Sequence, residues 1–330
     1  MYKLKQKSED FIVKEIPDFE TKEKGRYPIF LLKKVNYTTE NTIGRVADHL
    51  HIKPKFIGYA GIKDKKAVTE QYISINVLKR SFRSFKLKDI EIDFMGYNEE
   101  PIYLGRLIGN EFVITIRNLK EKDIVKLKEK TKVKPMVPNL FGEQRLSKNN
   151  SIVGKCIIKR DFEQAAGFIL QGKGKTETQV HDYLQKHPTD FVGAIRKIPL
   201  KIRKLYLHSY QSELFNRAVK EYIKTSKKNI KFPILGFGTE SKNKEVKELC
   251  EEIMENEGIT LRDFIIRSIP ELSSAGYERD VFIELKDFKI MKIEEDELNK
   301  KAKKAIVSFS LPKGCYATVV IDYLLRKSIC

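Results

Sequence analysis

The sequence predicts an α+β fold in which a sheet domain is interrupted by a mainly helical insertion. Strand patterns dominate the first 120 residues, helical patterns follow, and strand patterns return near the end of the chain. The length of 330 residues suffices for about two domains, each large enough to bury its own core. Strand patterns on both sides of the helical ones are typical of an insertion.

Strands are predicted in the first part of the chain where β-branched and aromatic residues gather or alternate with polar ones. These are residues 10–16, 29–35 and 56–61, with alternation at Ile73, Ile75 and Val77 and at Phe112, Ile114 and Ile116. One helix is expected among them, because Ile43, Val46, Ala47 and Leu50 recur at helical spacing. Thr39 is its expected N-cap.

Three further helical faces follow. Apolar residues share one face within 162–169, 207–222 and 246–253. Gly258 lies just past the third pattern and is expected to end that helix. At the C-terminal end, Val307, Phe309 and Leu311 alternate as in a strand, and the mostly β-branched run 315–321 is expected to be another.

The net charge of +19 points to a polyanionic partner, either a nucleic acid or an anionic membrane surface, with a merely solvated basic surface as the alternative. No apolar run approaches the ~20 residues of a spanning helix, and the start lacks the pattern of a secretory leader. The four cysteines and five histidines form no zinc spacing, and no nucleotide-binding glycine motif occurs. We therefore expect a reducing compartment, no metal and no nucleotide cofactor.

The stretch 59–72, YAGIKDKKAVTEQY, places Asp64 between Lys63 and two further lysines. Flanking cations favour an ionised carboxylate, which can act as nucleophile, base or electrostatic stabiliser. From the residues alone, a surface ion pair is the competing interpretation. A second candidate is 139–145, NLFGEQR, where Phe141 is either a stacking surface for an unstacked base or a core residue.

The stretch 59–72 resembles the signature of the tRNA pseudouridine synthase D family, Gly-x-Lys-Asp-x-x-Ala-x-Thr, which carries the family's catalytic aspartate. Five further segments resemble family motifs in the same order: 5–15, 105–112, 139–145, 212–216 and 310–318. The six segments are spread from residue 5 to residue 318 in the family's order, so together they make the resemblance specific, although each segment alone is weak evidence.

The resemblance implies a pseudouridine synthase core, built on a mixed, mostly antiparallel sheet and split by a family-specific domain. We expect the core at 1–148 and 303–330 and the insertion at 149–302. The implied enzyme isomerises a uridine of tRNA, in the D-arm region, to pseudouridine. We expect it to be a cytoplasmic monomer without a metal or an organic cofactor, and without a membrane partner.

The resemblance also assigns roles. Asp64 is the expected catalytic carboxylate, and Phe141 is expected to stack on the flipped-out base. Lys5 and Lys63 would be cations near Asp64 or a phosphate, Glu15 and Asn139 would line the site, and Arg145 would hold the loop or a phosphate. Two alternatives stay open: the same chemistry on another RNA, and a non-catalytic RNA-binding protein on this scaffold.

Overall fold

A computed structural model describes residues 1–77, 83–133, 135–146 and 149–325. The chain packs into two compact units, which are described separately. Unit 1 comprises Met1–Met136 and Glu284–Ala317, and unit 2 comprises Val137–Ile283 and Thr318–Cys330. The chain thus leaves unit 1 and returns to it after forming most of unit 2. The domain boundaries expected at 148/149 and 302/303 stay a prediction.

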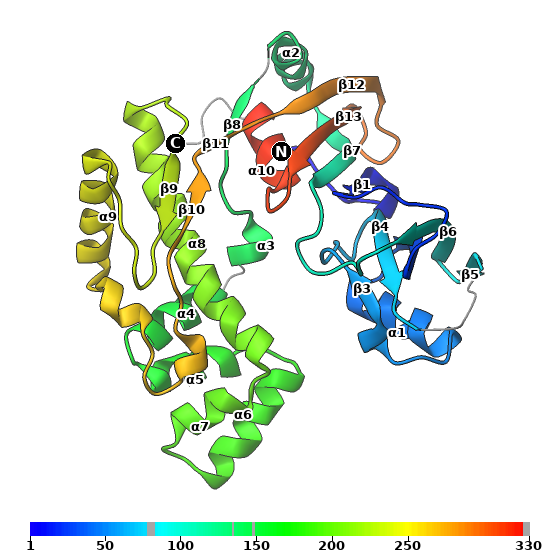
Figure 1. Cartoon of the computed structure of the whole chain (residues 1–330). Coiled ribbons are helices and arrows are strands. Elements are labelled where there is room, and N and C mark those ends of the chain that lie inside the picture. The colour runs from blue at the N-terminus through cyan, green and yellow to red at the C-terminus, as the bar shows by residue number, and fades with distance from the viewer. Residues whose placement is uncertain (78–82, 134, 147–148, 326–330) are drawn as a thin grey trace. The chain divides into compact units, whose positions relative to one another are not determined.

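A nine-stranded sheet forms most of unit 1 (Figure 1). Its strands, in spatial order, are β12 (Lys286–Glu295), β13 (Lys303–Pro312), β7 (Gly109–Leu119), β1 (Phe11–Ile16), β4 (Val68–Ile75), β2 (Tyr27–Val35), β6 (Ile90–Asn98) and β5 (Phe85–Leu87), with β3 (Ile57–Tyr59) also paired to β4. The β1–β4 pair is parallel and the other pairs of this sheet are antiparallel. The predicted mixed, mostly antiparallel sheet is confirmed.

Helix α1 (Thr39–His49) covers part of this sheet, as the apolar spacing predicts. Its Ile43, Val46 and Ala47 share a buried cluster with β2, β3, β4 and β6. The N-cap prediction was wrong by one residue, because the Thr38 side chain accepts the hydrogen bond from Asn41 N at 3.2 Å. Thr39 lies inside the first turn and is fully buried. The other helices of unit 1 are α2 (Glu121–Lys130), η1 (Ser8–Asp10) and η2 (Pro54–Phe56).

Unit 2 is mainly helical, as predicted for the middle of the chain. Besides a C-terminal helix described below, its elements include α3 (Glu143–Leu146), α4 (Asn150–Ile158), α5 (Phe162–Leu170), α6 (Lys175–Lys186), α7 (Phe191–Lys197), α8 (Leu200–Thr225), β9 (Lys231–Ile234), α9 (Lys244–Glu257), η3 (Leu261–Phe264), η4 (Pro270–Leu272) and β10 (Tyr277–Asp280). The three predicted helical faces lie on α5, α8 and α9. Gly258 ends α9 in the left-handed conformation, with φ of 62°. Strands β8 (Met136–Pro138) and β11 (Phe282–Glu284) pair where the chain changes unit.

The strand expected at 315–321 is wrong, because the chain forms helix α10 (Ala317–Leu325) there. Ala317, Val320, Ile321 and Leu324 are buried, and they recur at i, i+3, i+4 and i+7. Burial of this helical face therefore overrides the strand preference of the β-branched residues.

A buried ionic network ties the N-terminal segment of unit 1 to its C-terminal segment. The Arg117 guanidinium on β7 lies 2.8 Å from a carboxylate oxygen of Asp10 and 2.9 Å from one of Asp296. All three side chains are almost fully excluded from solvent. Because a lone buried charge is strongly unfavourable, each member requires the others.

Candidate active site

Asp64 lies in the loop that joins β3 to β4, and buried groups hold the main chain of this loop. Gln71 Nε2 donates to Gly61 O at 3.2 Å, and the Lys63 N–H donates to Thr39 Oγ1 at 2.9 Å. Lys34 Nζ donates to Asp64 O at 2.9 Å. Strand β4, the start of α1 and strand β2 therefore all contribute to fixing this loop.

The Asp64 side chain stays accessible although its main chain is anchored. It retains 27% of its exposure, and Lys5 Nζ lies 3.1 Å from Oδ2. Lys5 has a left-handed backbone, with φ of 55°, and its Nζ lies 4.0 Å from the centre of the Phe11 ring. The Asp64 carboxylate therefore has one adjacent cation and stays open to solvent, where a ligand can reach it.

Lys63 and Glu15 form a second ion pair beside this loop, and it is buried. Lys63 Nζ lies 2.7 Å from Glu15 Oε2, and the two side chains are 6% and 1% exposed. Lys63 Nζ also donates to Asn110 Oδ1 at 2.6 Å, while Glu15 Oε1 accepts from the Tyr72 N–H at 3.2 Å. The pair therefore connects the Asp64 loop with β1, β4 and β7.

Sequence reasoning missed Lys34, which is fully buried next to Asp64. Burial lowers the pKa of Lys34 to about 8; the charge of Asp64 opposes this shift and the charge of Lys63 adds to it. A signal was available in the alternation of β2, because Phe30, Leu32 and Lys34 are all buried and share one face of the strand. A lysine at a core-facing strand position is unusual enough to mark a site.

The predicted residues Asn139 and Phe141 lie together in unit 2, where neighbouring side chains fix both. Arg279 on β10 donates from Nε to Asn139 O at 2.9 Å and from Nη2 to Asn139 Oδ1 at 2.5 Å. Asn216 on α8 accepts from Phe141 N at 2.8 Å and donates to Phe141 O at 2.9 Å. Arg279 and this role of Asn216 were not predicted from the sequence, and nothing in the local pattern around Arg279 singles it out.

The Phe141 ring is only 6% exposed. The Arg279 guanidinium lies over the ring at 4.4 Å from its centre, and Phe215 meets it edge-on at 5.5 Å. Arg145, on α3, lies 5.6 Å from the ring centre, and its Nε donates to Ser212 Oγ at 3.4 Å. The structure therefore groups the predicted residues into two sets: Asp64, Lys5, Lys63 and Glu15 in unit 1, and Asn139, Phe141 and Arg145 in unit 2.

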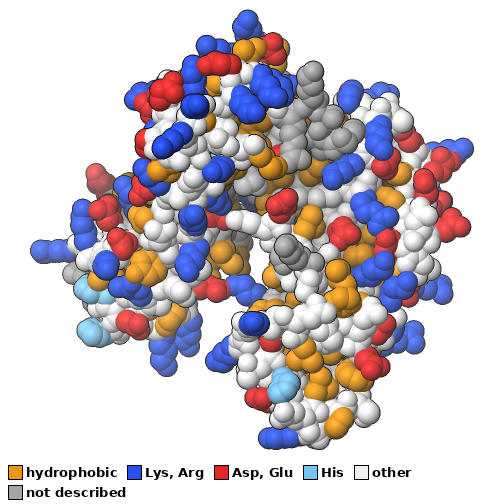
Figure 2. All heavy atoms as spheres, turned by 180° about the vertical axis from the view of Figure 1, so that it is seen from behind, with side chains coloured by type: hydrophobic (Ala, Val, Ile, Leu, Met, Phe, Trp, Pro, Cys, Tyr) orange, Lys and Arg blue, Asp and Glu red, His pale blue; other side chains and the backbone are white. Residues whose placement is uncertain are grey.

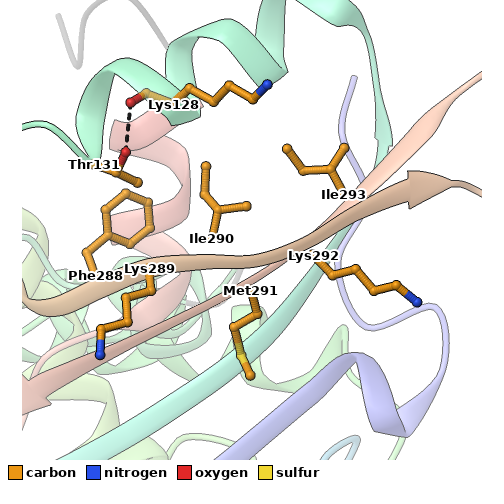
Figure 3. Close-up of a pocket in the computed structure, with 8 residues that line it drawn as sticks. All are labelled: Lys128, Thr131, Phe288, Lys289, Ile290, Met291, Lys292 and Ile293. Carbon is orange, nitrogen blue, oxygen red and sulfur yellow. Dashed lines mark hydrogen bonds between the residues drawn. The ribbon is translucent and has the colours of Figure 1, made fainter.

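A shallow groove of about 580 Å³ lies between α2 and β12, away from all of these residues. Figure 3 shows Phe288, Ile290 and Ile293 directed toward α2, and Lys289 and Met291 directed away from it. The groove contains none of the predicted site residues.

Two kinds of site are absent from the part of the chain that the structure describes. No three His, Cys, Asp or Glu side chains there are grouped so that they could hold a metal ion. No helix there is both long enough and apolar enough to cross a bilayer.

Comparison with known proteins gives a consistent result along the chain. A family model described as tRNA pseudouridine synthase D (TruD) matches residues 2–181, 169–229 and 218–323. A relative named "Probable tRNA pseudouridine synthase D", from Methanococcoides burtonii, is 30% identical over 409 aligned residues, covering 98% of this chain and 93% of the relative. The "tRNA pseudouridine synthase D" of Aquifex aeolicus is 29% identical, covering 99% and 98%.

The fold agrees with these sequence matches. A crystal structure of a protein from Methanosarcina mazei, described as "Putative tRNA pseudouridine synthase D (TruD)", superposes with a TM-score of 0.76 at 28% identity. The match covers 98% of this chain and 93% of that one. Because the family model spans most of the chain and the relatives align over nearly all of it, this chain belongs to the tRNA pseudouridine synthase D family.

Proposed function

We propose that this enzyme isomerises one uridine of tRNA to pseudouridine, and that Asp64 supplies the catalytic carboxylate. The proposal rests on a difference within one loop between an anchored main chain and an accessible side chain. Buried groups hold the main chain at Gly61, Lys63 and Asp64, yet the Asp64 carboxylate reaches solvent. Catalysis needs such a group, held in place on the protein side and open on the substrate side.

The reaction balances without any outside oxidant or reductant. The N1–C1′ bond breaks, the base turns, and a C5–C1′ bond forms; C5 then loses its proton and N1 gains one. A carboxylate can attack or stabilise the sugar at C1′, and it can accept a proton. The Lys5 ammonium lies 3.1 Å from the Asp64 carboxylate and places a positive charge beside it in each of these roles.

We assign supporting roles to the other predicted residues of unit 1. Lys63 and Glu15 are too deeply buried to bind a phosphate, so we assign them to holding the loop. Lys5 is 16% exposed and lies beside the carboxylate, so we assign it to Asp64 itself.

In unit 2, we propose that Phe141 supports the flipped-out base and that Arg145 contacts the same nucleotide or its phosphate. Asn139 is 6% exposed and accepts from Arg279, so we assign it to lining the site by holding that side chain. The ring lies under the Arg279 guanidinium, so a base reaches it when that side chain moves aside. Phe141→Leu keeps the apolar volume but removes the aromatic face. We expect a turnover decrease of about 5–150-fold, corresponding to the ~1–3 kcal/mol of base stacking. Single-turnover kinetics test this, with thermal unfolding as a control; unchanged turnover in a folded variant contradicts the stacking role.

Positive charge is proposed to hold the phosphates of the tRNA. Lys and Arg side chains are spread over the face seen in Figure 2, in agreement with the net charge of +19. We expect the logarithm of the binding constant to fall steeply and linearly with the logarithm of salt concentration, because bound phosphates release counterions. Filter binding between about 50 and 200 mM salt measures this slope, and a flat response argues against electrostatic binding.

Mapping pseudouridines in RNA from cells with and without the gene tests the proposed function. We expect one tRNA signal in the D-arm region to disappear in the deletion strain and to return with the wild-type gene but not with Asp64→Asn. Loss of a signal in another RNA only would support the alternative substrate. An unchanged map in all RNA would contradict the catalytic proposal and leave an RNA-binding protein. We further propose that the enzyme acts as a monomer, which sedimentation tests directly.

A further inference from the structure

Lys34 occupies a buried core position, where a lysine is not explained by the needs of folding alone. It is fully buried on β2, on the same face as the core residues Phe30 and Leu32. Thr69 of β4 lies opposite it in the sheet. Lysine is almost never fully buried without a partner of opposite charge, because taking an ammonium out of water is costly.

The partners of Lys34 are two main-chain carbonyls. Its Nζ donates to Tyr37 O at 2.7 Å and to Asp64 O at 2.9 Å. Within the described residues, no carboxylate lies within ion-pair distance of this ammonium, whereas Lys5 and Lys63 each have one. The charged groups that act on it are the carboxylate of Asp64 and the ammonium of Lys63, and its lowered pKa agrees with this incomplete compensation.

An apolar side chain of similar volume would fill the same space without the cost of a buried charge. The contribution of the lysine must therefore come from the groups that it holds. One of them is the peptide carbonyl of Asp64, the residue whose carboxylate is proposed to react. Fixing that peptide fixes the origin and direction of the side chain, and a misplacement of about 1 Å can reduce a rate by about 100-fold.

We propose that Lys34 is a positioning residue for pseudouridine formation, which holds the main chain of Asp64 from inside the sheet domain so that the carboxylate meets C1′ of the uridine. This inference rests on the proposed function of Asp64. Because a buried side chain does not touch RNA, Lys34 is expected to affect the catalytic step and not the binding of tRNA. Loss of Lys34 must reduce kcat and leave KM for tRNA nearly unchanged.

The test uses the purified full-length chain and tRNA transcripts labelled with tritium at C5 of uridine, since that hydrogen leaves in the reaction. Lys34→Met removes charge and donors at similar volume, and Lys34→Gln removes the charge but keeps an amide donor. Lys33→Met is the matched control: Lys33 is the adjacent lysine on the opposite face of β2, 43% exposed and 4.0 Å from Glu70. Thermal unfolding is measured for every variant.

We expect kcat to fall about 10–100-fold in Lys34→Met and less in Lys34→Gln, with KM within about twofold of the wild type. Lys33→Met should keep the wild-type kcat. The proposal is overturned if every folded Lys34 variant keeps kcat within about twofold, or if only KM changes. It is also overturned if neither variant folds, because the lysine would then serve folding itself. Asp64→Asn is assayed in parallel; its full activity would instead refute the proposed function.

Discussion

Asp64→Asn is expected to lower pseudouridine formation by about 1,000-fold or more while leaving tRNA binding within a few-fold of the wild type. The amide has nearly the same shape as the carboxylate, so the loop and its anchors at Lys34 and Thr39 are preserved. It has no negative charge, however, and serves neither as nucleophile nor as proton acceptor at neutral pH. Tritium release measures the rate, and filter binding measures the affinity.

Asp93→Asn is a suitable control for the general effect of removing a carboxylate, because Asp93 is an exposed aspartate on β6 of the same sheet. This variant should turn over like the wild type. Full turnover by Asp64→Asn would remove Asp64 from the chemistry. Loss of binding together with turnover would indicate instead that the charge at this position organises the RNA-binding surface.

Lys63→Met is expected to destabilise unit 1 by about 3–5 kcal/mol, because it leaves the Glu15 carboxylate buried without its cation. The present distance between the two charges is 2.7 Å, and neither side chain has appreciable access to water. Lys63 also holds Asn110 on β7, and that contact is lost in the same variant. Chemical denaturation measures the change in the free energy of unfolding.

The double variant Glu15→Gln, Lys63→Met separates the buried charge from the packing. A neutral glutamine still accepts from the Tyr72 N–H, so we expect the double variant to recover most of the lost stability. If the double variant is as unstable as Lys63→Met, the defect lies in packing or in the Asn110 contact. If Lys63→Met is as stable as the wild type, the ion pair has no structural role.

Much of the fold was predictable because burial follows simple periodicities. Alternation predicted the strands around Ile114 and Val307, and helical spacing predicted α5, α8 and α9. The failures have one common cause, which is tertiary context. Most of the run 315–321 lies in a helix, because Ala317, Val320 and Ile321 of the run and Leu324 beyond it recur at helical spacing and are buried together.

The candidate site could be predicted only in part from the sequence. The motif around Asp64 and the N-terminal segment 5–15 singled out residues that the structure does group together, namely Lys63 from the first and Lys5 and Glu15 from the second. Lys34 and Arg279 were missed, because their roles arise from partners 30 and 140 positions away in sequence. Local patterns carry no information about contacts of that kind, although an inward-facing lysine in an apolar strand is a signal worth searching for.

The network around Arg117 has a consequence for how the protein is synthesised. Strands β12 and β13 and the carboxylate of Asp296 come from the part of the chain made after most of unit 2. Until the ribosome has delivered them, β7 is an edge strand paired only with β1, and the Arg117 guanidinium lacks its partners Asp296 and Glu297. Unit 1 therefore completes its folding after most of unit 2 has been translated, and the nascent chain carries an open sheet edge during that interval.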